Sequence, residues 1–268
     1  MGIDFKNILF TGLLLTAGVV GCKKQSDSEN TKVYTHAITG LFNPGGYFID
    51  NTVEGLNYAM SFEGLQGIEM DVQFSADSSL WMFHDLELDG KTTGSGTICQ
   101  RSDEFMSGLR YLESNESLTK LVDVDLSKVQ GVKDVFIDVK YVGACSNIVP
   151  SANKLEQECV QFLDHPSLSV TFIINNSELA QEMKQLGYSI WSDADEPGDI
   201  DLNSTIYDGW FLRNKTISEE QIVEVQNGGK SVILYENYSP GAIHEALSKG
   251  PEAILVEDVK EAVLLSAE

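Results

Sequence analysis

The chain has 268 residues, and its 41 acidic and 18 basic side chains give a formal net charge of -23 at pH 7. A chain this acidic is repelled by nucleic-acid backbones and anionic lipid surfaces, so we exclude nucleic acid as a partner and expect a cation-dependent site or a neutral or cationic ligand. The length beyond the N-terminal segment suits a single larger domain, because one α/β barrel commonly occupies about 250 residues.

The N-terminus has the features of an export signal. The apolar run from Ile8 to Val20 has the length of a signal-peptide core and is shorter than the roughly 20 apolar residues of a membrane span. It ends in Val19-Val20-Gly21-Cys22, which resembles a bacterial lipobox. We therefore predict a lipoprotein signal peptide over residues 1–21, lipidation of Cys22 and a flexible tether over residues 22–31. A plain secretory signal with a chance cysteine is the alternative.

This segment predicts where the protein is found. The mature protein would lie in a bacterial cell envelope, attached to a membrane by its lipid anchor and facing the periplasm or the cell exterior. Lys23 after the cysteine, in place of Asp, favours the outer membrane by analogy.

The first elements of the domain are a short apolar run and a helix. The run from Lys32 to Ala37 contains His36 near its end and is followed by a Gly/Pro-rich loop. Asn51 and Glu54 then stand at the spacing of a capping box, which predicts the start of a helix.

The next segment, from Gly67 to Asp85, alternates as a strand does, so Glu69 and Asp71 share one face and the apolar residues between them share the other. Two carboxylates held together away from water require a cation or a shared proton, which indicates a hard divalent ion with oxygen ligands or a proton-sharing pair. A second strand ends at His84, and histidine is the proton carrier of neutral pH. The alternative is the solvated face of an antiparallel strand.

The rest of the chain predicts an α/β fold of one domain, a closed (β/α)8 barrel. Leu86 to Thr97 is a polar, Gly-rich loop, Ser102 starts a helix, and a further alternating strand places Asp138 and Lys140 on one face. Strand-then-helix units follow to the C-terminus, which favours a parallel sheet. A dinucleotide-binding fold is the weaker alternative, because no Gly-x-Gly-x-x-Gly motif follows the first strand. There are nine candidate strands, one too many, and we expect Asp208 to Leu212 to be the irregular segment.

Cysteine usage leaves three residues besides the predicted lipidation site. Cys99, Cys145 and Cys159 have no metal-type spacing. Cys145 and Cys159 could close a short loop, but a pair of buried free thiols is the favoured interpretation.

In a barrel of this kind the chemistry lies at the C-terminal ends of the strands. The polar residues identified above end four consecutive predicted strands: His36, then Glu69 and Asp71, then His84, then Asp138 and Lys140. Their convergence predicts one functional site.

The same residues carry a resemblance to a known family. In order they are His36, Asp50-Asn51-Thr52, Glu69-x-Asp71, His84-Asp85, Lys91 to Gly96 and Asp138-x-Lys140. This order resembles the glycerophosphodiester phosphodiesterases, TIM barrels that carry His-Arg, Pro-Glu-Asn-Thr, Glu-x-Asp, His-Asp, Arg-Thr-Thr-Asn-Gly-Ser-Gly and Glu-x-Lys. The segment from Ile254 to Asp258 looks like the last strand of that family.

The resemblance implies a metal-dependent hydrolase that converts small glycerophosphodiesters into glycerol 3-phosphate and an alcohol. It implies Glu69, Asp71 and Asp138 as ligands of Ca2+ or Mg2+, and His36 and His84 as the acid/base pair. Lys140 would bind the phosphate of the substrate.

Three departures from the family pattern affect this expectation. The Arg after the first His is Ala37 here, the later Glu is Asp138, and the Pro-Glu of the loop motif is lost, with Asp50 at the Glu position. A catalytically degenerate, lipid-anchored binding homologue is therefore an alternative function, and a different phosphodiester substrate is a second one.

Overall fold

The computed structural model describes residues 31–37, 49–128, 131–140, 145 and 150–266. The predicted signal peptide over residues 1–21, Cys22 and almost all of the predicted tether lie outside the described residues, as does most of the loop after Ala37. Within the described part of the chain, no helix is both long enough and apolar enough to cross a membrane.

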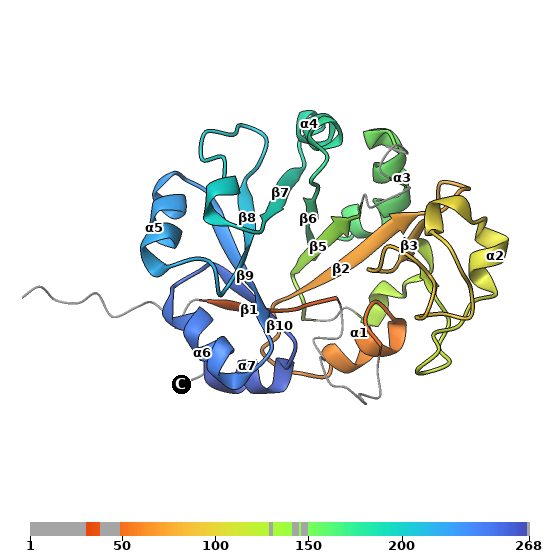
Figure 1. Cartoon of the computed structure of the whole chain (residues 1–268), viewed down its shortest axis with the longest axis horizontal. Coiled ribbons are helices and arrows are strands. Elements are labelled where there is room, and N and C mark those ends of the chain that lie inside the picture. The colour runs from red at the N-terminus through yellow and green to blue at the C-terminus, as the bar shows by residue number, and fades with distance from the viewer. Residues whose placement is uncertain (1–30, 38–48, 129–130, 141–144, 146–149, 267–268) are drawn as a thin grey trace, which may run out of the picture.

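A closed barrel of parallel strands forms the body of the protein (Figure 1). Its strands are β1 Lys32–Thr35, β2 Gly67–Phe74, β5 Asp134–Val139, β6 Ser169–Ile173, β7 Ser189–Ala194, β8 Gly209–Arg213, β9 Ser231–Asn237 and β10 Ala253–Val256. The barrel closes because β1 pairs in parallel with β10 on one side and with β2 on the other. The predicted (β/α)8 architecture is confirmed.

The expectation for the surplus strand is wrong. The segment from Asp208 to Leu212 is not irregular, because Gly209–Arg213 forms β8, which pairs in parallel with β7 and β9. The extra strand is β3, Leu80–Met82, which pairs antiparallel with β2 and lies outside the barrel. His84 therefore follows a strand of an insertion and does not end a barrel strand.

Helices cover the outside of the barrel. They are α1 Val53–Ala59, α3 Ala152–Leu163, α4 Ser177–Gln185, α5 Glu219–Asn227, α6 Pro240–Ser248 and α7 Val259–Ser266. The connection from β7 to β8 holds the 3-10 helix Pro197–Asp199. Ser218 and Gln221 form the predicted capping box of α5. At α1, however, the cap is Thr52, whose side chain accepts from the Gly55 N–H, and Asn51 is free for another role.

An insertion between β2 and β5 builds a small lobe beside the barrel. It contains β3, a 3-10 helix at Ile98–Gln100, α2 Asp103–Ser107, β4 Thr119–Lys120 and 3-10 helices at Leu121–Asp123 and Leu126–Lys128. Figure 1 shows β2, in orange, running out of the barrel towards β3 and α2. The register agrees, since Gly67 to Val72 pair with β5 whereas Val72 to Phe74 pair with β3. β2 thus carries the site residues and also holds the lobe in place.

Strand alternation divides the apolar residues of the barrel into two layers. On β2, Ile68, Met70 and Val72 are fully buried in the layer between strands and helices. The interior of the barrel holds a separate aromatic-rich cluster of Tyr34, Phe136, Ile173, Trp191, Phe211, Ile233, Ala253 and Leu255. Glu69 and Asp71 point to the interior side, as the period-two pattern predicts.

The cysteine prediction is wrong in one respect and right in another. Cys99 and Cys145 form a disulfide, with their Cα atoms 5.7 Å apart, whereas Cys159 is a buried free thiol on α3. The bridge joins the 3-10 helix of the insertion to the segment that follows β5. The pairing depends on how the insertion folds back over the barrel, which cysteine spacing does not encode.

Candidate active site

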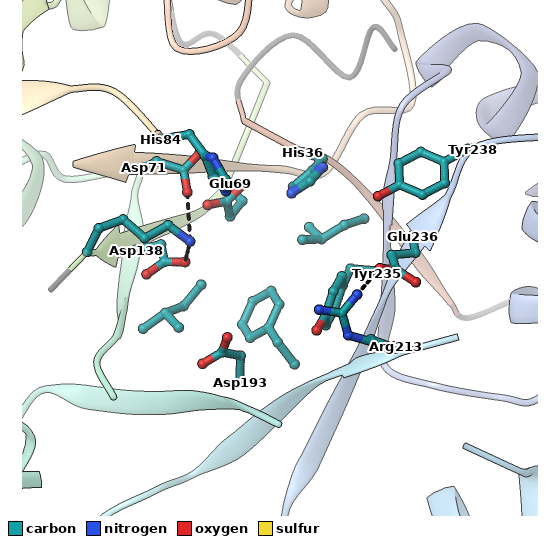
Figure 2. A pocket seen from close by; sticks show the side chains of 14 residues that line it. His36, Glu69, Asp71, His84, Asp138, Asp193, Arg213, Tyr235, Glu236 and Tyr238 are labelled. Carbon is teal, nitrogen blue, oxygen red and sulfur yellow. Dashed lines mark hydrogen bonds and ion pairs between the residues drawn. The ribbon is translucent and has the colours of Figure 1, made fainter. Parts of the chain in front are cut away.

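A pocket of about 240 Å³ opens at the C-terminal ends of the barrel strands. Its lining includes all six residues that the sequence predicts to be catalytic, metal-binding or substrate-binding: His36, Glu69, Asp71, His84, Asp138 and Lys140. Figure 2 shows His84, Asp71, Glu69 and Asp138 on one side of the pocket and Tyr235, Glu236, Tyr238 and Arg213 on the other. The convergence predicted from strand ends is therefore present, although His84 comes from the insertion.

Three carboxylates form a compact group on the first of these sides. Glu69, Asp71 and Asp138 each offer an oxygen atom, and these oxygens lie within 4.8 Å of one another. The pairing of β2 with β5 accounts for this, because Asp71 and Asp138 are opposite each other in the ladder. Glu69 and Asp71 are 2% and 1% exposed, so water does little to screen their charges.

The carboxylates are held by neighbours that fix their orientation. Asn51 donates from Nδ2 to Asp71 Oδ2 and accepts from the Asp71 backbone N–H, both at 2.9 Å. Its backbone has φ 58°, a conformation that Asn tolerates better than most residues. The Ala37 N–H donates to Glu69 Oε2 at 2.8 Å. Asn51, which the capping-box pattern assigned to the helix terminus, is instead a partner of a candidate metal ligand.

Lys140 shares this side of the pocket with the carboxylates. Its ammonium lies 2.6 Å from Asp138 Oδ2 and 3.1 Å from Asp71 Oδ1. When all of these groups are ionised, the three carboxylates exceed the single ammonium by two negative charges. That charge and the all-oxygen donor set fit a hard divalent cation.

The pKa values of these groups reflect the excess of negative charge. Burial, followed by the charge of Asp71, raises the pKa of Glu69 well above its usual range. Burial raises the pKa of Asp138 to about 6. Burial also opposes ionisation of Asp71, but Lys140 and the two histidines lower the pKa of that carboxyl below its usual value. The group is therefore electrostatically strained unless a cation is added.

His84 reaches the pocket through a backbone clamp. The side chain of Gln73, which is 2% exposed on β2, shares its two Nε2 hydrogens among the carbonyl oxygens of Phe83, His84 and Asp85, which lie 3.0, 3.3 and 2.9 Å from Nε2. Nδ1 of His84 lies 3.1 Å from Oδ1 of Asp85. This hydrogen bond, followed by the charge of Asp71, raises the pKa of His84 above its usual value.

His36 follows β1 and contacts a residue from the other end of the chain. Its Nδ1 makes a short hydrogen bond with Oε1 of Glu257, which directly follows β10. Burial of the ring opposes protonation, but this contact outweighs it and raises the pKa of His36 to about 10.

The second side of the pocket contains residues that sequence reasoning missed. Arg213 ends β8, donates from Nε to Asp195 at 2.8 Å and pairs with Glu236. Glu236 has φ 65° where the pairing of β9 with β10 changes register. Tyr235, Tyr238 and Asp193 also line this side. The strand-end rule, applied beyond the fourth predicted strand, would have found Arg213 and Asp193.

Position 37 stands where the family pattern has Arg. Ala37 is buried, with φ 48°. Among the described residues that line the pocket, the Lys and Arg side chains are those of Lys140 and Arg213, and both are paired with carboxylates.

Comparison with known proteins agrees with this geometry. The family model described as the Glycerophosphoryl diester phosphodiesterase family matches residues 44–185. No curated protein matches the sequence significantly. Solved structures share the fold at low identity. A putative glycerophosphoryl diester phosphodiesterase from Agrobacterium tumefaciens has a TM-score of 0.74 at 16% identity over 88% of this chain and 97% of its own.

Two further structures extend the comparison. A putative glycerophosphoryl diester phosphodiesterase from Silicibacter pomeroyi has a TM-score of 0.73 at 13% identity, over 91% of this chain and 97% of its own. A phosphodiesterase from Oleispira antarctica, in complex with the product sn-glycerol-3-phosphate, has a TM-score of 0.71 at 16% identity, over 90% and 98%.

The barrel and the family match together define a phosphoric diester hydrolase. The chain belongs to the glycerophosphoryl diester phosphodiesterase family.

Proposed function

We propose that the protein hydrolyses glycerophosphodiesters to glycerol 3-phosphate and an alcohol, and that it requires Ca2+ or Mg2+ held by Glu69, Asp71 and Asp138. The observation that carries the proposal is the group of three carboxylates whose oxygens lie within 4.8 Å of one another. The Oleispira antarctica phosphodiesterase, which has the same fold and was solved with sn-glycerol-3-phosphate, supports the product.

The residues of the pocket supply the parts of such a reaction. When bound, the cation would neutralise the phosphate and the charge that develops on it. Lys140, between Asp71 and Asp138, adds a second positive group at the same place. His36 and His84 both line the pocket and differ in setting, since His36 pairs with a buried carboxylate and His84 with an exposed one. One histidine takes the proton from the nucleophile and the other donates a proton to the departing alkoxide.

The test is an assay of the purified protein with glycerophosphocholine and Ca2+ or Mg2+, followed by release of glycerol 3-phosphate. His84→Ala should lower turnover by about 100-fold or more, because general acid/base catalysis contributes about 10²- to 10⁴-fold. His244→Ala is the matched control, since His244 is exposed on α6. The proposal would be contradicted if the protein released neither glycerol 3-phosphate nor a cyclic product from any of several diesters.

The loss of the family Arg at Ala37 supports a second candidate, a binding homologue without catalysis. Calorimetry separates the two, because tight binding of glycerophosphocholine without turnover, unchanged in His84→Ala, favours the binding protein.

We also propose that the mature protein is exported and anchored to the bacterial envelope by lipid on Cys22. The Cys99–Cys145 bridge supports export, since disulfides persist in oxidising compartments. Wild-type protein should fractionate with membranes and Cys22→Ser with the soluble fraction. A Cys22→Ser variant that stays with membranes would contradict the lipid anchor.

A further inference from the structure

The seam of the barrel brings together two residues that are 221 positions apart in the sequence. β1 and β10 pair in parallel, and the last pair in their register is Thr35 with Val256. The ladder continues one step, because the backbone N–H of His36 donates to the backbone carbonyl oxygen of Val256 at 3.2 Å. The register therefore places His36 beside Glu257 at the C-terminal edge, where the pocket opens.

The contact between their side chains is directed and sheltered. Glu257 Oε1 faces Nδ1 of His36, and the Glu257 side chain is 6% exposed whereas that of His36 is 27% exposed. Figure 2 shows the His36 ring inside the pocket, between the carboxylate side and Tyr238. Nδ1 is thus occupied by Glu257, and Nε2 is the ring nitrogen left for a substrate.

We propose that Glu257 is a positioning residue for the proposed hydrolysis: its carboxylate holds the Nδ1–H tautomer of His36, so that Nε2 is the atom that exchanges a proton with the substrate. The inference rests on the proposed function.

The chemistry of the two groups supports this role. An ionised carboxylate only accepts hydrogen bonds, so the nitrogen facing it must carry the proton. Because Nδ1 keeps its proton towards Glu257 whether the ring is charged or neutral, Nε2 is the nitrogen that gains or loses a proton. A carboxylate behind a reacting histidine thus fixes both its tautomer and its orientation.

The other histidine lacks an equally firm support. His84 contacts Asp85 at 3.1 Å, with side-chain exposures of 56% and 37%. An exposed contact of this kind competes with water. The buried partner of His36 should therefore contribute more to turnover than Asp85 does.

The experiment compares Glu257→Gln with Asp258→Asn. Gln keeps the size of the side chain but can donate or accept, so it no longer selects one tautomer. Asp258 is the exposed neighbour whose carboxylate accepts from the Glu261 N–H and not from His36. We expect kcat of Glu257→Gln to fall at least about 100-fold with little change in KM, and that of Asp258→Asn to stay within about threefold of wild type.

Two further readouts separate positioning from general damage. The His36 ring nitrogens, followed by 15N NMR to a pH at which the ring is neutral, should show a proton on Nδ1 in wild type and a mixture of tautomers in Glu257→Gln. Ca2+ should raise the melting temperature of wild type and of Glu257→Gln equally, because Glu257 is not one of the three candidate ligands.

The proposal is overturned if Nδ1 of the neutral His36 ring carries no proton in wild type, a result that needs no variant to fold. It is also overturned if Glu257→Gln retains kcat within about threefold. If the wild type is inactive on every diester tested, the proposed function is contradicted. The NMR comparison still decides whether Glu257 holds the tautomer.

Discussion

Glu69→Gln should abolish the stabilisation of the protein by Ca2+ or Mg2+ and lower turnover at least about 100-fold. A cation at a hundredfold excess over its Kd stabilises the native state by about 2.7 kcal/mol. For a domain of this size that corresponds to a rise in melting temperature of roughly 5–10 °C. Replacing a ligand should cost more activity than the 10- to 100-fold that is typical of residues behind a ligand.

Glu69 is the informative carboxylate because of its environment. Burial and the charge of Asp71 raise its pKa, so its ionised form is disfavoured in the metal-free protein. The neutral Gln keeps an oxygen that can accept from the Ala37 N–H, as Glu69 does. In chelator, Glu69→Gln should therefore be at least as stable as wild type. Asp71 is less suitable, since it also pairs with Lys140 and Asn51.

The measurement is thermal unfolding of both proteins in chelator and in increasing Ca2+ or Mg2+. Glu63→Gln is the matched control, because it removes the same charge from an exposed position before β2. It should keep the full response to the cation. A wild-type melting curve that chelator and cations leave unchanged would mean that no metal binds at these carboxylates, and the enzyme proposal would lose its main support.

The parts of the site that the sequence predicts are those encoded locally. Alternation along β2 places Glu69 and Asp71 on one face, and the same pattern places Asp138 on β5. In a parallel barrel such faces meet at one end, so the carboxylate group follows from period two and strand order.

The insertion could not be separated from the barrel by the same means. β3 is a three-residue apolar strand, and its pattern is that of a short barrel strand. What distinguishes it is its partner, since it pairs antiparallel with the end of β2. Periodicity reports which side of a strand is buried and carries no information on the partner, which is why β8 was mistaken for the irregular segment.

Residues that support the site depend on contacts between distant segments. Glu257 meets His36 only because the barrel closes between β1 and β10. Gln73 looked like an ordinary strand residue, yet it fixes the backbone around His84. Such partners are set by register across the sheet, and a single sequence does not specify that register.

The disulfide is a contact of the same kind, and its removal should have the largest effect on stability. Cys99 and Cys145 are 46 residues apart. Closing a loop of that length lowers the entropy of the unfolded chain and so stabilises the native state by about 4 kcal/mol. A Cys99→Ala/Cys145→Ala variant should therefore melt roughly 8–16 °C lower than wild type. Urea unfolding of wild type with and without reductant should show a loss of similar size.

Loss of this bridge should lower the melting temperature but change turnover less. The Gln73 clamp and the pairing of β2 with β3 still hold His84 when the bridge is absent, because neither involves Cys99 or Cys145. Cys159→Ala is the control: Cys159 is a free thiol, so this variant should keep the full sensitivity to reductant. An unfolding midpoint of wild type that reductant does not move, or a Cys159→Ala variant that loses the response, would refute the Cys99–Cys145 pairing and its assigned share of the stability.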